Sequence, residues 1–313
     1  MGKLRRSYRH SHIDDPGAPC TMSCAPCLPM SSQAPAEKKF EDYETLKACT
    51  VCGCADIPRV FEPDVAQCAR CHVFFRTPRP TQEEIRRSYD YGSNYAEWQQ
   101  NDAGRRSIWE RRLAILGRYK KAGRLLDVGA GDGFFLDMAK AAGFETFGTE
   151  LSATGADYAR KRGHQLLLGQ INDVDFKELK FDVITIWHVL EHLPNPGEAL
   201  SILSGLLAPG GVFAVAVPND DNDLFRYRIG RRKGPNPLGY FHWGKEIHLT
   251  HFQPATLRAA LSSHGFKVRQ FGVDDVYSDR KPSNMAKLAM QKSLSTLFNW
   301  HFSMAMYCIC TRA

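Results

Sequence analysis

From Gly123 onward, short apolar runs alternate with segments of helical periodicity. This alternation is typical of a parallel sheet that helices cover on both faces, so the sequence predicts an α/β fold. The predicted strands are Arg124–Val128, Glu145–Glu150, Gln165–Leu168, Phe181–Trp187, Gly211–Pro218, Lys267–Val273 and Met304–Thr311.

Composition divides the remainder of the chain. Residues 1–40 are rich in Pro, Ser and Cys without hydrophobic periodicity, which predicts a flexible tail. Residues 41–80 contain a compact cysteine-rich unit, and residues 81–122 carry helical patterns that predict a linker or cap. The α/β domain then occupies residues 123–313, with an insertion on the substrate side at residues 219–247.

Helix signals mark two segments clearly. One helix is predicted from Arg105 to Tyr119. A second begins after Asn195 as N-cap, has Pro196 at its first position, and stops at Pro209, where Gly210 and Gly211 follow.

Overall composition limits the class of protein. An apolar content of 43% excludes wholesale disorder, and no apolar run approaches the roughly 20 residues that span a bilayer. The basic amino end lacks an apolar stretch behind it, so we expect a cytoplasmic protein with no membrane partner. A net charge of +7 is weaker than that of most dedicated nucleic-acid binders.

A glycine-rich loop follows the first predicted strand of the domain. Gly129–Gly133 joins that strand to a helix, so the chain can turn tightly and expose backbone N–H groups to a ligand. Glu150 lies seventeen residues after Gly133, at the end of the next strand, where a carboxylate can accept hydrogen bonds from both ribose hydroxyls. Together they predict a nucleoside-containing cofactor.

Two residues disfavour a nicotinamide cofactor. Phe134 stands where the dinucleotide fingerprint requires a third glycine. Asp127, just before the loop, would repel a pyrophosphate, whereas it suits a ligand that carries an ammonium group.

Four ordered segments resemble the class I S-adenosylmethionine (SAM)-dependent methyltransferases, in the subgroup related to ubiquinone-biosynthesis methyltransferases. Leu126–Gly133 looks like their first motif, and Gly148–Ser152 looks like their acidic second-strand motif. Phe181–His192 is similar to their fourth-strand motif, and His248–Phe252 matches a C-terminal pattern of the subgroup. The resemblance covers Leu125–Ala313.

This resemblance implies a Rossmann-like sheet of seven strands, mostly parallel, with the last strand antiparallel. The donor methyl group would then lie at the carboxyl edge of the first and fourth strands. The loop glycines would line the methionine part, Glu150 the ribose, and Asn172 or Asp173 the adenine. The residues assigned to SAM are Asp127, Gly129, Gly131, Gly133, Glu150, Leu151, Asn172 and Asp173.

A histidine–glutamate pattern follows the fourth strand. In a helical turn, His188, Glu191 and His192 share one face near the carboxyl edge. One imidazole, with His188 as first choice, would accept the proton of an acceptor hydroxyl. Alternatively, these side chains bind a divalent ion together with His248 or His251, as in some relatives with the Glu–His pair, or they only tie down the loop.

The insertion carries Arg226, Arg228, Arg231, Arg232 and Lys233. Guanidinium groups recognise phosphate and carboxylate, so the sequence favours methyl transfer to a small anionic or phosphorylated acceptor, most simply at oxygen. The alternatives are a solvated loop without a specific role, an RNA methyltransferase and a non-catalytic binding module. Nothing in the sequence indicates the oligomeric state.

The clustered cysteines indicate metal ligation. Cys49 and Cys52 form one Cys-x-x-Cys pair, and fifteen residues separate it from a second pair, Cys68 and Cys71. Four thiolates in this pattern close a structural Zn²⁺ site, and the span predicts a zinc ribbon. A redox dithiol is disfavoured because the βαβ context is missing. Cys54 is spare or an alternate ligand.

A separate cysteine pattern lies in the amino-terminal tail. Cys20, Cys24 and Cys27 match the iron–sulfur spacing of radical SAM enzymes, which is a minor alternative because Pro26 replaces the usual aromatic residue.

Overall fold

The computed structural model describes most of the chain from Phe40 onward. The described residues are 40–61, 63–92, 102–231, 236–238, 241–242, 246–276, 281–298 and 303–313. The predicted tail with Cys20, Cys24 and Cys27 lies outside them. Among the described helices, none has the length and apolar character needed to cross a membrane.

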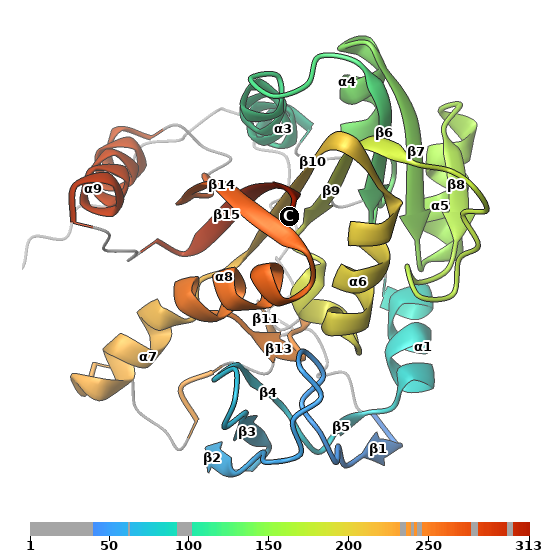
Figure 1. Ribbon diagram of the computed structural model, residues 1–313. Helices are drawn as coiled ribbons and strands as arrows, with labels where there is room; N and C mark the ends of the chain where they lie inside the picture. The colour runs from blue at the N-terminus through green and yellow to red at the C-terminus, as the bar shows by residue number, and fades with distance from the viewer. Residues whose placement is uncertain are drawn as a thin grey trace, which may run out of the picture. The chain divides into compact units, whose positions relative to one another are not determined.

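A seven-stranded sheet forms the centre of the α/β domain (Figure 1). All neighbouring strands pair in parallel except β15, which is antiparallel to both β10 and β14. This confirms the predicted fold class. In spatial order the strands are β14 (Phe266–Val273), β15 (Ala305–Arg312), β10 (Leu207–Pro218), β9 (Phe181–Trp187), β6 (Gly123–Val128), β7 (Phe144–Glu150) and β8 (Gln165–Leu168).

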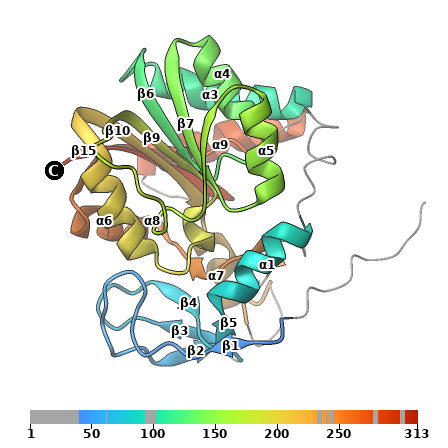
Figure 2. The ribbon, with the colours of Figure 1, turned by 90° about the vertical axis from the view of Figure 1, so that its right-hand side faces the viewer.

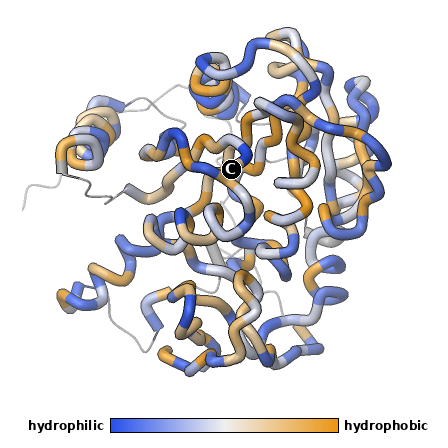
Figure 3. Tube along the Cα trace, in the orientation of Figure 1, coloured by the Kyte–Doolittle hydropathy of each residue, from blue (hydrophilic) through white to orange (hydrophobic). Residues whose placement is uncertain are grey.

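Helices cover both faces of this sheet (Figure 2). Because alternate strand residues point to opposite faces, Leu125 packs in one core and Leu126 in the other. The core around Leu125 is closed by α3 (Asp102–Leu116), α4 (Phe134–Ala141) and α5 (Ala153–Lys161). The core around Leu126 is closed by α6 (Pro196–Leu206) and α8 (Pro254–Ser263). Apolar residues accordingly gather on the central strands in Figure 3.

One element boundary differs from the prediction. The helix expected to reach Pro209 ends at Leu206, and β10 begins at Leu207 rather than Gly211. Leu207 is fully buried and pairs with Phe181, and a register shift before Val212 accommodates the intervening turn. Burial of Leu207 therefore outweighs the local stop signal. The N-cap Asn195 also makes no side-chain capping bond.

The cysteine-rich unit forms small sheets beside the α/β domain. Its strands are β1 (Tyr43–Glu44), β2 (Arg59–Phe61), β3 (Val65–Gln67), β4 (Phe74–Arg76) and β5 (Arg79–Pro80). β1 pairs with β5, while β2, β3 and β4 continue into β13 (Thr250–His251) from the far end of the chain. The division into residues 41–80, 81–122 and 123–313 stays a prediction, because this four-stranded sheet takes strands from two of those segments.

The remaining elements connect these layers. They are α1 (Gln82–Gly92), the 3-10 turn η1 (Leu190–His192), α7 (Asp221–Arg228), β11 (Phe241–His242), β12 (Glu246–Ile247) and α9 (Pro282–Phe298).

Candidate active site

The glycine loop turns sharply off the end of β6. Gly129, Gly131 and Gly133 have φ values of 75°, 58° and 79°, which L side chains rarely adopt. A Cβ atom on Gly129 would come within 2.6 Å of a methyl group of Val189. Only glycine therefore fits this turn, which opens directly onto the first turn of α4.

Glu150, at the end of β7, lies directly against this loop. Its Oε2 accepts a hydrogen bond from the Gly131 N–H at 2.8 Å, and its Oε1 accepts one from the Ser152 N–H at 2.8 Å. These two bonds fix the orientation of the carboxylate beside the loop. We call Gly129–Gly133 together with Glu150 the donor crevice.

A buried carboxyl group ends β6 below the loop. Asp127 is 3% exposed and accepts a hydrogen bond from the Thr185 hydroxyl at 2.6 Å. Burial raises the pKa of Asp127 to about 7, although the Thr185 bond opposes the shift. Its charge therefore changes near neutral pH, and a cation nearby would favour the ionised form.

Helix α3 contacts the glycine loop through an ion pair between Arg105 and Asp132. The two terminal nitrogens of Arg105 bind the carboxylate of Asp132 at 2.5 and 3.1 Å, and the guanidinium lies 4.7 Å from the Phe134 ring centre. Sequence reasoning missed this pair because α3 and the loop meet only in the folded chain.

The groups around the donor crevice fit SAM. Asp127 and Glu150 are carboxylates, the kind of group that can bind an ammonium group and ribose hydroxyls. Nδ2 of Asn172, the residue predicted to contact the adenine, is buried and has no hydrogen-bond partner in the described part of the chain. Asp173 is exposed, and Leu151 is half-buried directly after Glu150.

The acceptor side of the site begins where β9 ends. His188 has a φ of 56°, and its ring lies between two carboxylates. Nε2 is 2.9 Å from Oδ2 of Asp274, and Nδ1 is 3.6 Å from Oε1 of Glu191. The sequence analysis did not identify Asp274, although it directly follows β14, whose end lies at the same carboxyl edge.

A buried arginine completes this chain of charges. Nη2 of Arg112 is 2.5 Å from Oδ2 of Asp274, and its guanidinium lies between the rings of Trp109 and Trp187 at 4.8 and 4.7 Å. Arg112 and His188 hold the pKa of Asp274 well below its usual range, despite the opposing effect of burial.

The charge environment of His188 affects its predicted role. Burial lowers its pKa, but the hydrogen bond with Asp274 and the nearby carboxylate of Glu191 outweigh this effect and raise the pKa of His188 to about 9. The ring is then protonated at neutral pH, and both nitrogens face carboxylates. This geometry favours His188 as a positive charge and does not favour the proton-accepting role predicted for it.

Glu191, His192 and His248 form a compact group, the Glu–His cluster. One potential ligand atom from each lies within 4.8 Å of the others, and all three residues are buried. Neither carboxylate oxygen of Glu191 has a hydrogen-bond partner within the described residues. Nδ1 of His192 lies 2.5 Å from the Ile247 carbonyl oxygen, which directs Nε2 toward Glu191 at 3.9 Å. The cluster can therefore bind a cation.

His251 lies next to the cluster but outside it. Its ring is 1% exposed, is centred 6.4 Å from that of His248, and faces Asp220 with Nδ1 and Oδ1 3.5 Å apart. Of the two histidines predicted as alternatives, the structure brings only His248 into the cluster.

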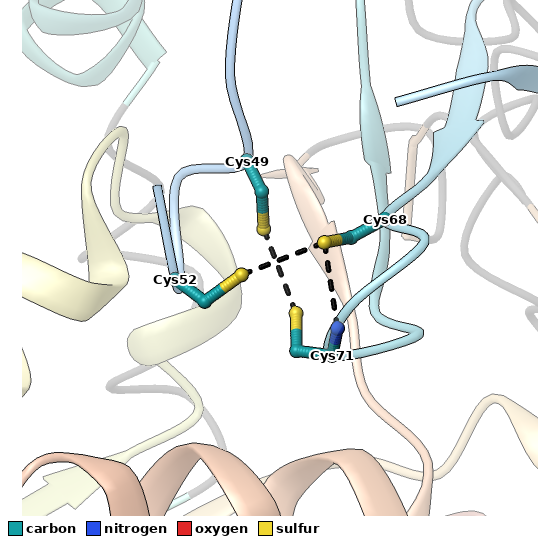
Figure 4. A group of neighbouring side chains, drawn as sticks. All are labelled: Cys49, Cys52, Cys68 and Cys71. Carbon is teal, nitrogen blue, oxygen red and sulfur yellow. Dashed lines mark hydrogen bonds between the residues drawn. The ribbon is translucent and has the colours of Figure 1, made fainter. Parts of the chain in front are cut away.

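The four predicted zinc ligands converge in the cysteine-rich unit (Figure 4). The sulfurs of Cys49 and Cys71 are 3.6 Å apart, and those of Cys52 and Cys68 are 3.5 Å apart. Zn–S bonds of about 2.3 Å give tetrahedral edges of about 3.8 Å, so the arrangement fits a zinc ion. Cys54 lies outside this group and approaches the carbonyl oxygen of Asp56 instead.

The basic insertion packs on the cysteine-rich unit. Leu224 and Leu238 form a small core with Val65 and Phe74. The described basic side chains of the insertion remain exposed on α7 and directly after it; they are Arg226, Arg228 and Arg231. The predicted contributions of Arg232 and Lys233 lie outside the described residues.

A seven-stranded sheet of this topology, with an acidic residue beside a glycine loop, defines the class I SAM-dependent methyltransferases. Residues 95–270, more than half of the chain, match the methyltransferase domain family. The chain belongs to this family, and the resemblance seen in the sequence is confirmed.

Individual similarities are more distant. An uncharacterized protein from Methanocaldococcus jannaschii is 29% identical over 43% of this chain and 62% of its own length. A ubiquinone biosynthesis O-methyltransferase from Alkalilimnicola ehrlichii is 30% identical over 33% of this chain and 45% of its own length. The chain thus spans less than two thirds of these curated relatives.

One solved structure shares the fold. It is a chain from the complex between the Haloferax volcanii Trm112 methyltransferase activator and the putative methyltransferase, with a TM-score of 0.51 and 16% identity. The match covers 73% of this chain and 97% of that chain.

Proposed function

We propose that this protein transfers the methyl group of SAM to an oxygen atom of a small-molecule acceptor. The observation that carries the proposal is the arrangement of the carboxyl edge, where the donor crevice and the His188 charge network follow neighbouring strands of one sheet. The ubiquinone biosynthesis O-methyltransferase relatives support transfer to oxygen.

The donor crevice would bind and orient SAM, which supplies an electrophilic methyl group on a sulfonium. Glu150 would accept hydrogen bonds from the ribose, and Asp127 would stabilise the ammonium group of the methionine part. The buried side chains around the crevice would exclude water. Orientation of this kind supplies much of the rate enhancement in a direct displacement.

The acceptor side would lower the cost of ionising the acceptor hydroxyl, whose proton would pass to solvent water while the sulfonium leaves as the neutral thioether S-adenosylhomocysteine. With its pKa raised to about 9, His188 would be an imidazolium at neutral pH and would stabilise developing negative charge at its partly exposed ring. The exposed arginines of the insertion, Arg226, Arg228 and Arg231, favour an acceptor that carries phosphate or carboxylate.

Zinc would hold the cysteine-rich unit together through Cys49, Cys52, Cys68 and Cys71. All four ligand positions come from the protein, so the ion would be structural rather than catalytic. A cytoplasmic location stays a prediction.

The donor site is tested by thermal unfolding with and without SAM. We expect SAM to raise the Tm of the wild-type protein, and Glu150→Gln to lose most of that increase because a ribose-accepting carboxylate is gone. Glu145→Gln is the matched control, since Glu145 lies on the same strand but is exposed. Absence of any SAM effect on the wild type would contradict the proposal.

The acceptor is tested by mass spectrometry. We expect a screen weighted toward phosphorylated sugars and other small anions to yield a product heavier by one methyl group. RNA methylation, or RNA binding that weakens steeply with salt, would instead favour the nucleic-acid alternative.

A second candidate activity is metal-assisted deprotonation at the Glu–His cluster. The buried carboxylate of Glu191, whose oxygens make no hydrogen bond within the described residues, favours it, because a divalent ion held by Glu191, His192 and His248 would lower the pKa of a bound hydroxyl. Electron paramagnetic resonance of added Mn²⁺ measures this directly. We expect one bound ion in the wild type, loss in Glu191→Gln, and no change in the exposed control Glu198→Gln.

A further inference from the structure

The cysteine-rich unit, residues 41–80 and called the ribbon below, contacts both segments that carry the Glu–His cluster. One is the turn from His188 to Gly197, and the other is the stretch from Ile247 to His251. These segments are about sixty residues apart in the sequence. The ribbon packs on the active-site side of the domain, and its Cys49 and Phe75 belong to the same core as Leu190.

The first segment is held by two ribbon contacts. The buried guanidinium of Arg79 donates through Nη1 to the Pro194 carbonyl oxygen at 2.7 Å while its Nε binds Glu44 at 2.8 Å. The Gly197 N–H donates to the Thr50 carbonyl oxygen at 3.1 Å. A Cβ atom on Gly197 would lie 2.2 Å from the Val51 carbonyl oxygen, so even alanine would separate the two surfaces.

The second segment is held by strand pairing. β13 pairs with β4, placing Thr250 opposite Phe75 and His251 opposite Phe74. The Arg76 N–H donates to the Leu249 carbonyl oxygen at 2.9 Å, which extends the ladder toward His248.

The two segments also bind each other directly. The Leu249 N–H donates to the Glu191 carbonyl oxygen at 2.9 Å, and the His192 ring binds the Ile247 carbonyl oxygen at 2.5 Å. The ribbon thus contacts both segments of the Glu–His cluster through hydrogen bonds to their backbone groups, which transmit small displacements because they tolerate little change in length.

We propose that the ribbon is a positioning element of the active site, and that Arg79 and Gly197 are the residues through which it sets the spacing of Glu191, His192 and His248. The proposal rests on the function proposed above, since it assigns the acceptor side of that same site. Neither residue contacts the cluster, so both are positioning residues rather than catalytic ones. The donor crevice makes no ribbon contact of this kind among the described hydrogen bonds.

Hydrogen–deuterium exchange on the full-length, zinc-loaded protein tests this coupling. Arg79→Lys keeps the positive charge beside Glu44. The lysine ammonium group lacks the planar guanidinium that binds the Glu44 carboxylate and the Pro194 carbonyl oxygen together. We expect amides in residues 188–194 and 247–251 to exchange at least tenfold faster in Arg79→Lys and in Gly197→Ala. Amides of residues 125–152, which include the donor crevice, should keep their wild-type rates.

Gly205→Ala is the matched control for Gly197→Ala. Gly205 lies on the same helix, and a Cβ atom there meets nothing within 4 Å. We expect this control to keep wild-type exchange throughout. Faster exchange confined to residues 41–80, with the two cluster segments unchanged, would overturn the proposal.

A spectroscopic signature separates positioning from general loosening. In ¹⁵N-histidine-labelled protein, His192 should show a single tautomer with a proton on Nδ1, because that nitrogen faces the Ile247 carbonyl oxygen. We expect a tautomer mixture in Arg79→Lys with SAM affinity within twofold of wild type. An unchanged His192 signal would count against the proposal. If neither the wild type nor any variant binds SAM, the proposed function fails. The exchange rates and the His192 tautomer would still measure whether the ribbon positions the cluster.

Discussion

The donor crevice and the Glu–His cluster lie at the same sheet edge but are built differently. The crevice comes from two neighbouring strand ends, nineteen residues apart at Gly131 and Glu150, and its contacts are bonds to backbone N–H groups. The cluster joins the turn after β9 to His248, which lies two residues before β13, the strand that pairs with the ribbon. Buried charged groups lie next to it. The crevice should therefore tolerate damage elsewhere, whereas the cluster should respond to changes far along the chain.

The largest expected effect comes from removing a zinc ligand. Cys68→Ser should abolish zinc binding and lower the Tm by about 10 °C, which corresponds to roughly 3 kcal/mol for a domain of this size. SAM affinity should change only a few-fold, because the crevice lies outside the ribbon. Zinc analysis and thermal unfolding measure this. Cys54→Ser is the control and should leave the Tm within a degree; equal losses in both variants would refute a zinc site at these four cysteines.

Blocking the glycine turn should have the next largest effect. Gly129→Val places a branched side chain at a positive φ and against Val189, so SAM binding should weaken by about 100-fold, or roughly 3 kcal/mol. Isothermal titration calorimetry measures the change. The control Gly205→Ala should retain wild-type affinity. Unimpaired SAM binding by Gly129→Val would place the donor elsewhere.

We expect an effect of intermediate size when the charge network around His188 is changed. Asp274→Asn removes the main hydrogen-bonding anion of His188, so its pKa should fall from about 9 by a unit or more, toward the ordinary value near 6.5. Histidine NMR titration measures it. Asp275→Asn, one residue along, should leave that pKa unchanged. A pKa near 6.5 in the wild type would restore His188 as a proton acceptor.

The smallest effect concerns pH and the donor. Burial raises the pKa of Asp127 to about 7, so its carboxyl group is neutral below that pH and charged above it. SAM affinity should therefore rise up to about tenfold from pH 6 to pH 8, through attraction to the ammonium group. The same raised pKa makes the ligand-free fold less stable as pH rises through 7. Asp127→Asn should remove both dependences, as calorimetry and urea unfolding at the two pH values will show.

The sequence was sufficient for the features that depend on local pattern. The strands follow apolar runs, the glycine loop follows a short motif, and the four converging cysteines follow a fixed spacing, so each was predictable. The start of β10 was not, because burial of Leu207 outweighed the Pro–Gly–Gly stop signal.

The acceptor side was predictable only in part. His188, Glu191 and His192 form one local pattern, but their ionisation depends on Arg112 and Asp274, which approach from distant elements. No sequence spacing connects such residues, so the pKa of His188 could not be predicted. The contact between Gly197 and the ribbon could not be predicted either, because glycine occurs near helix starts for several reasons other than close packing.

The central claim is that the donor crevice presents SAM toward the His188 network. The most direct measurement is a crystal structure of the protein soaked with S-adenosylhomocysteine, which is what remains of SAM after transfer. We expect the amino acid part of the compound to lie against Gly129–Gly133, its ribose to bind Glu150, and its sulfur to face His188. Density at any other place, or a crevice that stays closed to the compound while calorimetry detects no binding, would contradict it.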